Sequence, residues 1–184
     1  MNKATARTYR ERLYDLAETQ HGFVTTVDAR KLGIPAVELR KLAHRGKLEN
    51  VSRGVYRFRR LSGSENENYL QAILAVGEDA FLTRDAVLSF HNLAQVNPRL
   101  TRIGTRRRVR QNLPNQISVT KEYIPESEIE IRDGVRMSRV ARAIIESKGL
   151  IPQERLRDGL RKGIDLGLIT REEANEARRE LSKK

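Results

Sequence analysis

The set of side chains that comes nearest to a catalytic pattern is Asp133, Glu146 and Lys148. Some nucleases hold a metal ion with an aspartate followed by Glu-x-Lys, in which the glutamate and the lysine share one side of a strand. Here residues 139–148 are predicted to be helical, which would separate Glu146 and Lys148 by about 200° around the helix axis. We therefore expect no catalysis from this set and no enzymatic activity.

Metal and cofactor chemistry finds no further support in the sequence. The three histidines, His21, His44 and His91, are scattered and lack a metal-ligand spacing such as His-x3-His, and the chain has no cysteine. No glycine-rich motif of the kind that cradles phosphate or a dinucleotide is present. We therefore expect neither a metal ion nor a cofactor.

The chemistry that remains is the binding of a polyanion by basic side chains. The net charge is +12, and residues 1–60 carry 14 Lys and Arg against 6 Asp and Glu. Residues 61–150 carry 13 against 11, and residues 151–184 carry 9 against 7. A basic excess concentrated in one third of a chain is typical of nucleic-acid binding. A membrane surface fits less well because no basic helix has a strong apolar face. The remaining alternative is a basic domain without a polyanion partner.

The Lys and Arg side chains of residues 1–60 are expected to be positioned by short helices that end at glycines. Gly22 and Gly33 are expected to end the first and second helices. Thr25, with Asp28 three residues later, forms a capping-box pattern at the start of the second helix. Two short helices joined by a tight turn with glycine are typical of a helix-turn-helix. The three helices are expected over about residues 8–18, 27–32 and 35–45.

The third helix separates an apolar face from a basic one. Leu39, Leu42 and Ala43 form the apolar face. A small residue and cations on the opposite face suit a helix that enters the DNA major groove, although a single basic stripe is more often a solvated surface. The opposite face carries Ala36, Arg40, Lys41 and His44, and we expect Arg40, Lys41 and His44 to read base edges.

A β-hairpin is predicted directly after the third helix, over residues 48–58. Ser52-Arg53-Gly54 forms its turn, and Val55–Phe58 is β-prone. A hairpin after a helix-turn-helix is a wing, whose cations reach phosphates beside the groove. The complete set of expected DNA contacts is Thr26, Ala36, Arg40, Lys41, His44, Arg45, Lys47, Arg53, Arg57 and Arg59.

The rest of the chain is expected to form a small α+β domain that ends in a helical hairpin. We place the domains at residues 1–60 and 61–184, with a polar linker over 61–66 and a capping-box pattern at Ser64 and Glu67. Asp133-Gly134 is the strongest hairpin signal. Strands are expected over about 100–105, 117–120, 129–131 and 135–137. One helix is expected to end at about residue 76, and another to start at Thr83 or Asp85. Further helices are expected over 138–148, around the apolar stripe of Leu156, Leu160 and Ile164, and over 171–181.

A second basic patch precedes the strand at 117–120, and no acidic residue interrupts it. It can be a solvated edge, a second phosphate-contacting patch, or a docking site for an acidic partner. The patch comprises Arg102, Arg106, Arg107, Arg108 and Arg110, with Arg99 just before it.

Several runs in the first third resemble the N-terminal domain of AbiEi-type transcriptional regulators and antitoxins of type IV toxin–antitoxin systems. The runs are His21–Thr25, Ala29–Ile34, Leu39–Leu42, Arg45–Leu48 and Val51–Tyr56, with weaker matches at Ala80–His91, Ile131–Ser138 and Ala141–Ser147. The resemblance implies a repressor that binds the operator of its own toxin–antitoxin operon, at a single site or across inverted repeats, and a nucleotidyltransferase-like toxin as partner. The family's antitoxins typically carry a larger C-terminal domain than this chain does.

These observations predict a double-stranded DNA-binding protein that acts as a monomer or weak homodimer. A polar, basic start and no apolar run longer than Ala72–Val76 favour the cytoplasm over a membrane. One alternative is an interaction protein that neutralises the toxin, with DNA binding secondary. Another is an RNA-binding module, which the shortage of aromatic residues disfavours.

Overall fold

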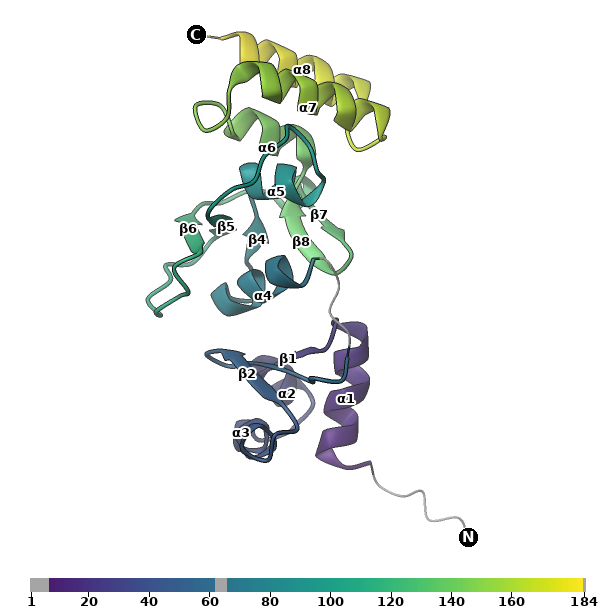
Figure 1. Cartoon of the computed structure of the whole chain (residues 1–184), viewed down its shortest axis with the longest axis vertical. Coiled ribbons are helices and arrows are strands. Elements are labelled where there is room, and N and C mark those ends of the chain that lie inside the picture. The colour runs from purple at the N-terminus through teal and green to yellow at the C-terminus, as the bar shows by residue number, and fades with distance from the viewer. Residues whose placement is uncertain (1–6, 62–65, 184) are drawn as a thin grey trace. The chain divides into compact units, whose positions relative to one another are not determined.

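A computed structural model describes residues 7–61 and 66–183 of the chain (Figure 1). It divides into two compact units, residues 1–75 and residues 76–184. The Ser64 half of the predicted capping box lies outside the described residues, as does most of the linker. The expected domain boundary at residue 60 stays a prediction. Among the helices described, none combines the length and apolar character needed to cross a membrane.

Hydroxyl side chains start two of the helices in unit 1. The first helix, α1 (Tyr9–Thr19), begins at Thr8, which forms a capping box with Glu11. The second helix, α2 (Thr26–Lys31), begins at Thr25, whose hydroxyl accepts a hydrogen bond from the backbone N–H of Asp28 at 3.1 Å. The Asp28 carboxylate in return accepts from the N–H of Thr25 at 2.8 Å. The capping box predicted at Thr25 is therefore present.

A third helix and a three-stranded sheet complete the winged helix-turn-helix. Helix α3 (Ala36–His44) follows α2 after a turn at Gly33, which has φ +66°. Strands β1 (Phe23–Thr25), β2 (Glu49–Ser52) and β3 (Val55–Arg57) form an antiparallel sheet in the order β1-β3-β2. Gly54 closes the β2–β3 turn with φ +77°, a backbone conformation that glycine adopts without strain. The predicted α+β class with an N-terminal winged helix-turn-helix is confirmed.

One hydrophobic core orients α3 within unit 1. Leu39 and Leu42 are buried on its inner side. Tyr14 of α1 packs edge-on against Phe58, with 5.2 Å between ring centroids. Burying a leucine side chain contributes about 1.5–3 kcal/mol, so these two leucines determine which face of α3 remains outside. The core comprises Leu13, Ala17, Val24, Ala29, Ile34, Leu39, Leu42, Leu48, Tyr56 and Phe58.

Unit 2 is built on a five-stranded mixed sheet in the order β6-β5-β4-β8-β7. The central strand, β4, was not predicted: it is two buried residues long, too short for any alternation to reveal it. It pairs antiparallel with β5 and parallel with β8. The strands are β4 (Phe81–Leu82), β5 (Thr101–Thr105), β6 (Ile117–Lys121), β7 (Ile129–Arg132) and β8 (Val135–Ser138).

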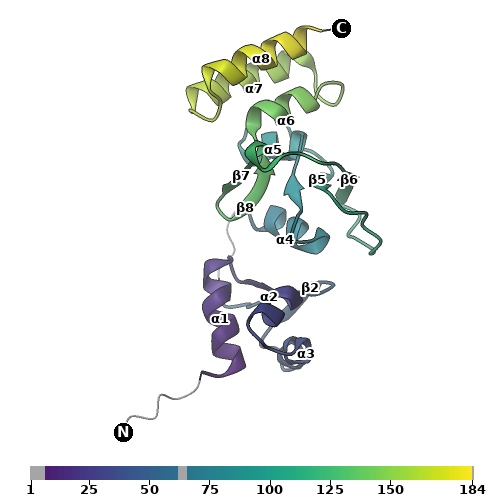
Figure 2. The same ribbon diagram turned by 180° about the vertical axis from the view of Figure 1, so that it is seen from behind.

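The helices of unit 2 include the predicted C-terminal hairpin. Helices α7 and α8 lie side by side and pack against α6 (Figures 1 and 2). Helix α6 is shorter than expected because Ser138 belongs to β8 and the helix ends at Glu146. The elements are α5 (Asp85–Phe90), the 3-10 turn η1 (Glu126–Glu128), α6 (Val140–Glu146), α7 (Gln153–Asp165) and α8 (Arg171–Ser182); α4 (Glu67–Val76) spans the boundary between the units.

Candidate nucleic-acid interface

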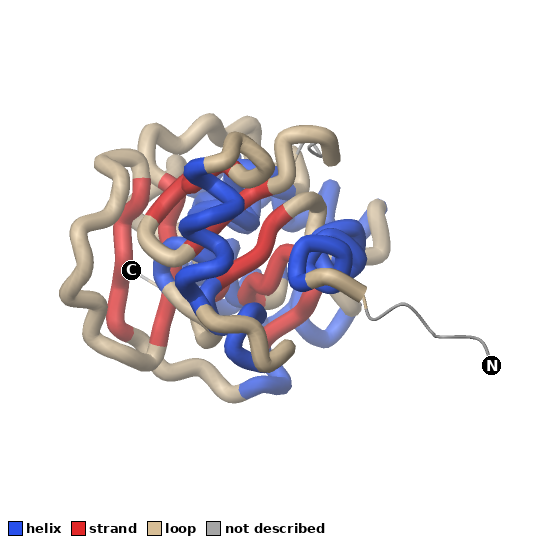
Figure 3. Tube along the Cα trace, turned by 90° about the horizontal axis from the view of Figure 1, so that it is seen from below, coloured by secondary structure: helices blue, strands red, loops and turns tan. Residues whose placement is uncertain are grey.

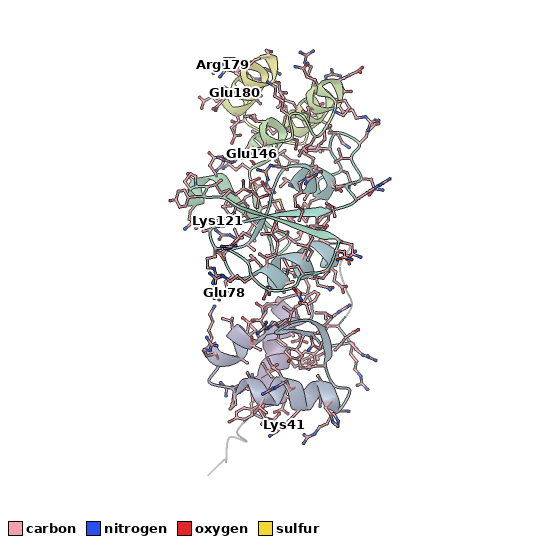
Figure 4. All side chains as sticks on the ribbon, turned by 90° about the vertical axis from the view of Figure 1, so that its left-hand side faces the viewer. Lys41, Glu78, Lys121, Glu146, Arg179 and Glu180 are labelled. Carbon is pink, nitrogen blue, oxygen red and sulfur yellow. The ribbon has the colours of Figure 1, made fainter. Side chains whose placement is uncertain are left out.

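The outward face of α3 carries the residues expected to read bases. Arg40 and His44 are exposed and have no ion-pair partner among residues 7–61 and 66–183. Lys41 is also exposed, and its Nζ lies 2.8 Å from Glu38 Oε1, so part of its charge is shared (Figure 4). Ala36 is exposed at the start of the helix. Helix α3, seen end-on in Figure 1, appears lengthwise in Figure 3.

Val37 belongs to the same face and was missed by the sequence reasoning. Its side chain is 40% exposed, which is unusual for a valine on a helix whose leucines are buried. Its spacing to Lys41 and His44, four and seven residues on, was a signal that could have placed it on this face. An exposed apolar side chain beside cations suits contact with a thymine methyl group.

Cations flank α3 on the loop that follows it and on the wing. Arg45, Lys47 and Arg53 are exposed, and in the described part of the chain they pair with no carboxylate. Arg59 is largely exposed, with its Nε 3.8 Å from a Glu49 carboxylate oxygen. An exposed pair at that distance is weak and does not prevent a phosphate contact.

Thr26 is half-buried where α2 meets the wing. Its backbone N–H donates to the carbonyl oxygen of Gly54 at 2.9 Å. Its hydroxyl lies so near Gly54 that a Cβ added there would be 3.0 Å from Thr26 Oγ1. Thr26 thus joins α2 to the wing.

Arg57 has partners of its own inside unit 1. Its guanidinium forms an ion pair with Glu67, and both side chains are about one-fifth exposed. The same guanidinium lies 5.9 Å from the centroid of the Phe23 ring. A phosphate contact by Arg57 would require this pair to open, a cost that Arg53 does not face.

Acidic residues distant in sequence divide the second basic patch. Arg102 Nε lies 2.9 Å from Asp85, and Arg106 lies 2.8 Å from Glu126. Arg107 makes a two-nitrogen contact with Asp79 at 2.5 and 2.9 Å. Arg108 and Arg110 are exposed. The patch is therefore not a continuous row of free cations. No local sequence pattern predicted the ion pairs of Arg102, Arg106 and Arg107.

The electrostatics of Asp79 show how firmly Arg107 is held. Burial by itself would raise the pKa of the Asp79 carboxyl, but hydrogen bonds from Arg107 and from the Thr105 hydroxyl outweigh it and lower the pKa. The Thr105 hydroxyl donates to Asp79 at 2.9 Å, and the backbone N–H of Arg106 donates at 3.1 Å. Asp79 is consequently ionised near neutral pH and ties the start of the patch to its own unit.

The residues of the Asp-Glu-x-Lys pattern lie in different surroundings. Glu146, on α6, accepts a hydrogen bond from the Thr83 hydroxyl at 3.2 Å and lies 2.7 Å from Arg142 Nε (Figure 4). Lys148 Nζ instead donates to backbone carbonyls of Glu180 and Lys183 at the end of α8. Asp133 occupies the β7–β8 turn with φ +48°. Within the described residues no group of three potential metal ligands occurs.

A polar cluster near Glu146 was not expected from the sequence. Burial raises the pKa of Glu122, with the Glu146 charge adding to the rise and Arg84 opposing it. Arg84 Nη2 lies 3.2 Å from Glu122 Oε2. Gly104 leaves the space that Glu122 and the Phe81 ring fill. Arg84 pairs with Glu122 and Arg142 with Glu146, so each carboxylate of this cluster has a cation beside it.

Residues 11–59 match a protein-family model described as "Transcriptional regulator, AbiEi antitoxin". The match covers α1 to the wing, and for this segment the resemblance stated from the sequence is confirmed. The family description is that of a regulator and antitoxin, not of an enzyme. No curated protein matches the chain significantly.

Proposed function

We propose that the protein is a sequence-specific double-stranded DNA-binding regulator that represses its own toxin–antitoxin operon. One observation carries the proposal: the outer face of α3 presents exposed Val37, Arg40, Lys41 and His44 while Leu39 and Leu42 hold the inner face in the core. The match of residues 11–59 to a family of regulators supports it.

Side chains divide into those that read bases and those that position the protein. We assign base contacts to Arg40, Lys41 and His44, with Ala36 and Val37 facing thymine methyl groups. Phosphate contacts are assigned to Arg45, Lys47, Arg53 and Arg59, which are exposed around the helix. Thr26, at the start of α2, is assigned a contact with DNA. Arg57 is assigned chiefly to holding the wing, because Glu67 and Phe23 engage it.

The wider setting follows from the family of the matched segment. The partners we propose are operator DNA and a nucleotidyltransferase-like toxin, in the cytoplasm, with no cofactor and no catalytic activity. The second patch would then contact phosphates or an acidic partner through Arg108 and Arg110, which are exposed and form no ion pair with the described residues.

A second candidate function is neutralisation of the toxin by direct binding, with DNA binding secondary. The observation that favours it is a pocket of about 840 Å³ beside α7 and α8. Its lining mixes apolar side chains with cations and contains no acidic residue; among them are Leu150, Leu156, Lys148, Arg157 and Lys183.

Fluorescence anisotropy on the duplex upstream of the gene, against an unrelated duplex, tests the first function. We expect affinity at least about a thousandfold higher for the upstream duplex at physiological salt. Arg40→Ala should reduce that preference by about tenfold or more. Arg155→Ala, an exposed arginine of α7, removes the same charge elsewhere and should leave the preference intact.

Equal affinity for both duplexes would refute sequence-specific binding. Toxin neutralisation that survives Arg40→Ala but is lost when Arg157 is changed to glutamate would favour the second function.

A further inference from the structure

The outer edge of β7 in unit 2 is open. Strand β7 is the last in the order β6-β5-β4-β8-β7, and among the described residues no strand pairs with its other side. Ile131 in its middle is 66% exposed. Proteins commonly protect such edges, because unpaired N–H and C=O groups recruit another strand.

The hairpin geometry identifies which backbone groups point outward. Asp133 and Gly134 form a two-residue turn with φ of +48° and +75°, and Arg132 pairs with Val135 across it. The pair that flanks such a turn is hydrogen-bonded, and hydrogen-bonded pairs alternate along an antiparallel ladder. The even-numbered residues therefore bond inward, as the bond from Arg139 N–H to the Glu128 carbonyl at 2.9 Å illustrates. Ile131 therefore directs both its N–H and its C=O outward, whereas the Ile129 N–H donates to the Glu126 carbonyl at the end of η1.

The side chains of this edge complement themselves when it is paired with its own copy. If two antiparallel β7 strands meet at Ile131, that residue faces itself and Glu130 faces Arg132 of the second copy. Glu130 and Arg132 already share one face, with Arg132 Nε 3.9 Å and His91 Nε2 3.8 Å from the Glu130 carboxylate. In this register the Glu130–Arg132 pairs are the non-hydrogen-bonded ones, in which side chains approach most closely.

We propose that β7 pairs with β7 of a second copy of the chain, forming a two-fold symmetric dimer through a continuous sheet. Ile131 N–H and C=O exchange hydrogen bonds across the axis, and two Glu130–Arg132 pairs flank it. A second copy fits better than an unrelated strand, because the opposite charges repeat under two-fold symmetry. The left-handed conformation of Asp133 limits the pairing to a short stretch, so the dimer is weak.

This dimer goes beyond the proposed function without depending on it, since it is measured without DNA. Sedimentation equilibrium of the full chain from about 1 to 300 µM is expected to show a reversible monomer–dimer equilibrium, in keeping with a small interface. Glu130→Arg or Arg132→Glu alone should raise the dissociation constant by about tenfold or more, because each places two like-charge pairs across the axis. The double swap E130R/R132E should return it to within about threefold of the original value.

Proline at the axis gives an independent test. Ile131→Pro removes an N–H that the β7–β8 ladder does not use, so the variant should keep its melting temperature and circular dichroism but lose the dimer. Ile131→Val retains the N–H and is the matched control, with the dimer kept.

A chain that remains monomeric throughout, or a dimer that tolerates Ile131→Pro and both single charge changes, would overturn the proposal. Either result leaves DNA binding to be judged separately, and specific DNA binding by a chain that never dimerises would refute only the dimer.

Discussion

Two arginines of the wing region, Arg53 and Arg57, are expected to respond differently to salt when each is changed to alanine. Arg53 is exposed, whereas Arg57 is paired with Glu67 and lies over Phe23. The logarithm of the DNA-binding constant falls with the logarithm of salt concentration with a slope of about −0.9 per neutralised phosphate. Four proposed phosphate contacts, Arg45, Lys47, Arg53 and Arg59, give about −3.6 for one protomer on a half-site.

Arg53→Ala should therefore change the slope to about −2.7 and weaken specific and unrelated duplexes alike. Arg57→Ala should leave the slope near −3.6 but lower the free energy of unfolding by about 2 kcal/mol, between the values for exposed and fully buried pairs. Anisotropy titrations at four or more salt concentrations measure the slopes, and urea denaturation measures the stability. If Arg57→Ala reduced the slope as much as Arg53→Ala and left stability unchanged, our assignment of both residues would be wrong.

Three further predictions concern stability. Gly104→Ala should destabilise unit 2 by about 1–3 kcal/mol in urea denaturation, because the added Cβ would lie 2.4 Å from the Phe81 ring and 2.5 Å from Glu122 Oε1. An unchanged unfolding midpoint would contradict this packing. The pKa of the Asp79 carboxyl is lowered in the folded protein, so its ionised form stabilises the fold at pH values above its usual pKa of 3.8. This stabilisation is lost as the pH falls through the lowered pKa of the folded state. Asp79→Asn should thus destabilise the protein at pH 7 and flatten its pH dependence below pH 4, and parallel wild-type and variant curves would count against the Asp79 assignment. Thr25→Ala should cost about 1 kcal/mol by removing the cap of α2, measured by thermal denaturation, with Thr101→Ala on β5 as a comparison outside any helix cap.

Sequence reasoning succeeded where local rules decide the structure. The cap at Thr25, the turn at Gly54 and the leucines of α3 each act over a few residues, and each was found where it was predicted. These local features together were enough to predict the winged helix-turn-helix and the exposed stripe of α3. Val37 was placed on neither face of the third helix, although its spacing to Lys41 and His44 matches the exposed stripe.

Features that depend on distant partners escaped the sequence reasoning. The row of arginines from Arg102 to Arg110 looked continuous, yet Asp79, Asp85 and Glu126 approach it from other parts of unit 2. Glu67 likewise pairs with Arg57 although the two residues are ten positions apart in the sequence. Ion pairs of this kind follow from the tertiary fold, so charge counting alone overstates how many cations are free.

The two-residue strand β4 has a consequence for the order in which the chain can fold. Its parallel partner in β8 is Met137, whereas the sheet of unit 1 is complete within residues 23–57. Contacts between residues far apart in sequence form slowly, because a long loop must close first. As the chain leaves the ribosome, the winged helix-turn-helix can therefore fold first. Strand β4 is then already synthesised, but its parallel partner β8 is not yet available to pair with it. We expect unit 2 to refold more slowly than unit 1, with the buried Phe81 and Leu82 exposed to aggregation in the interval.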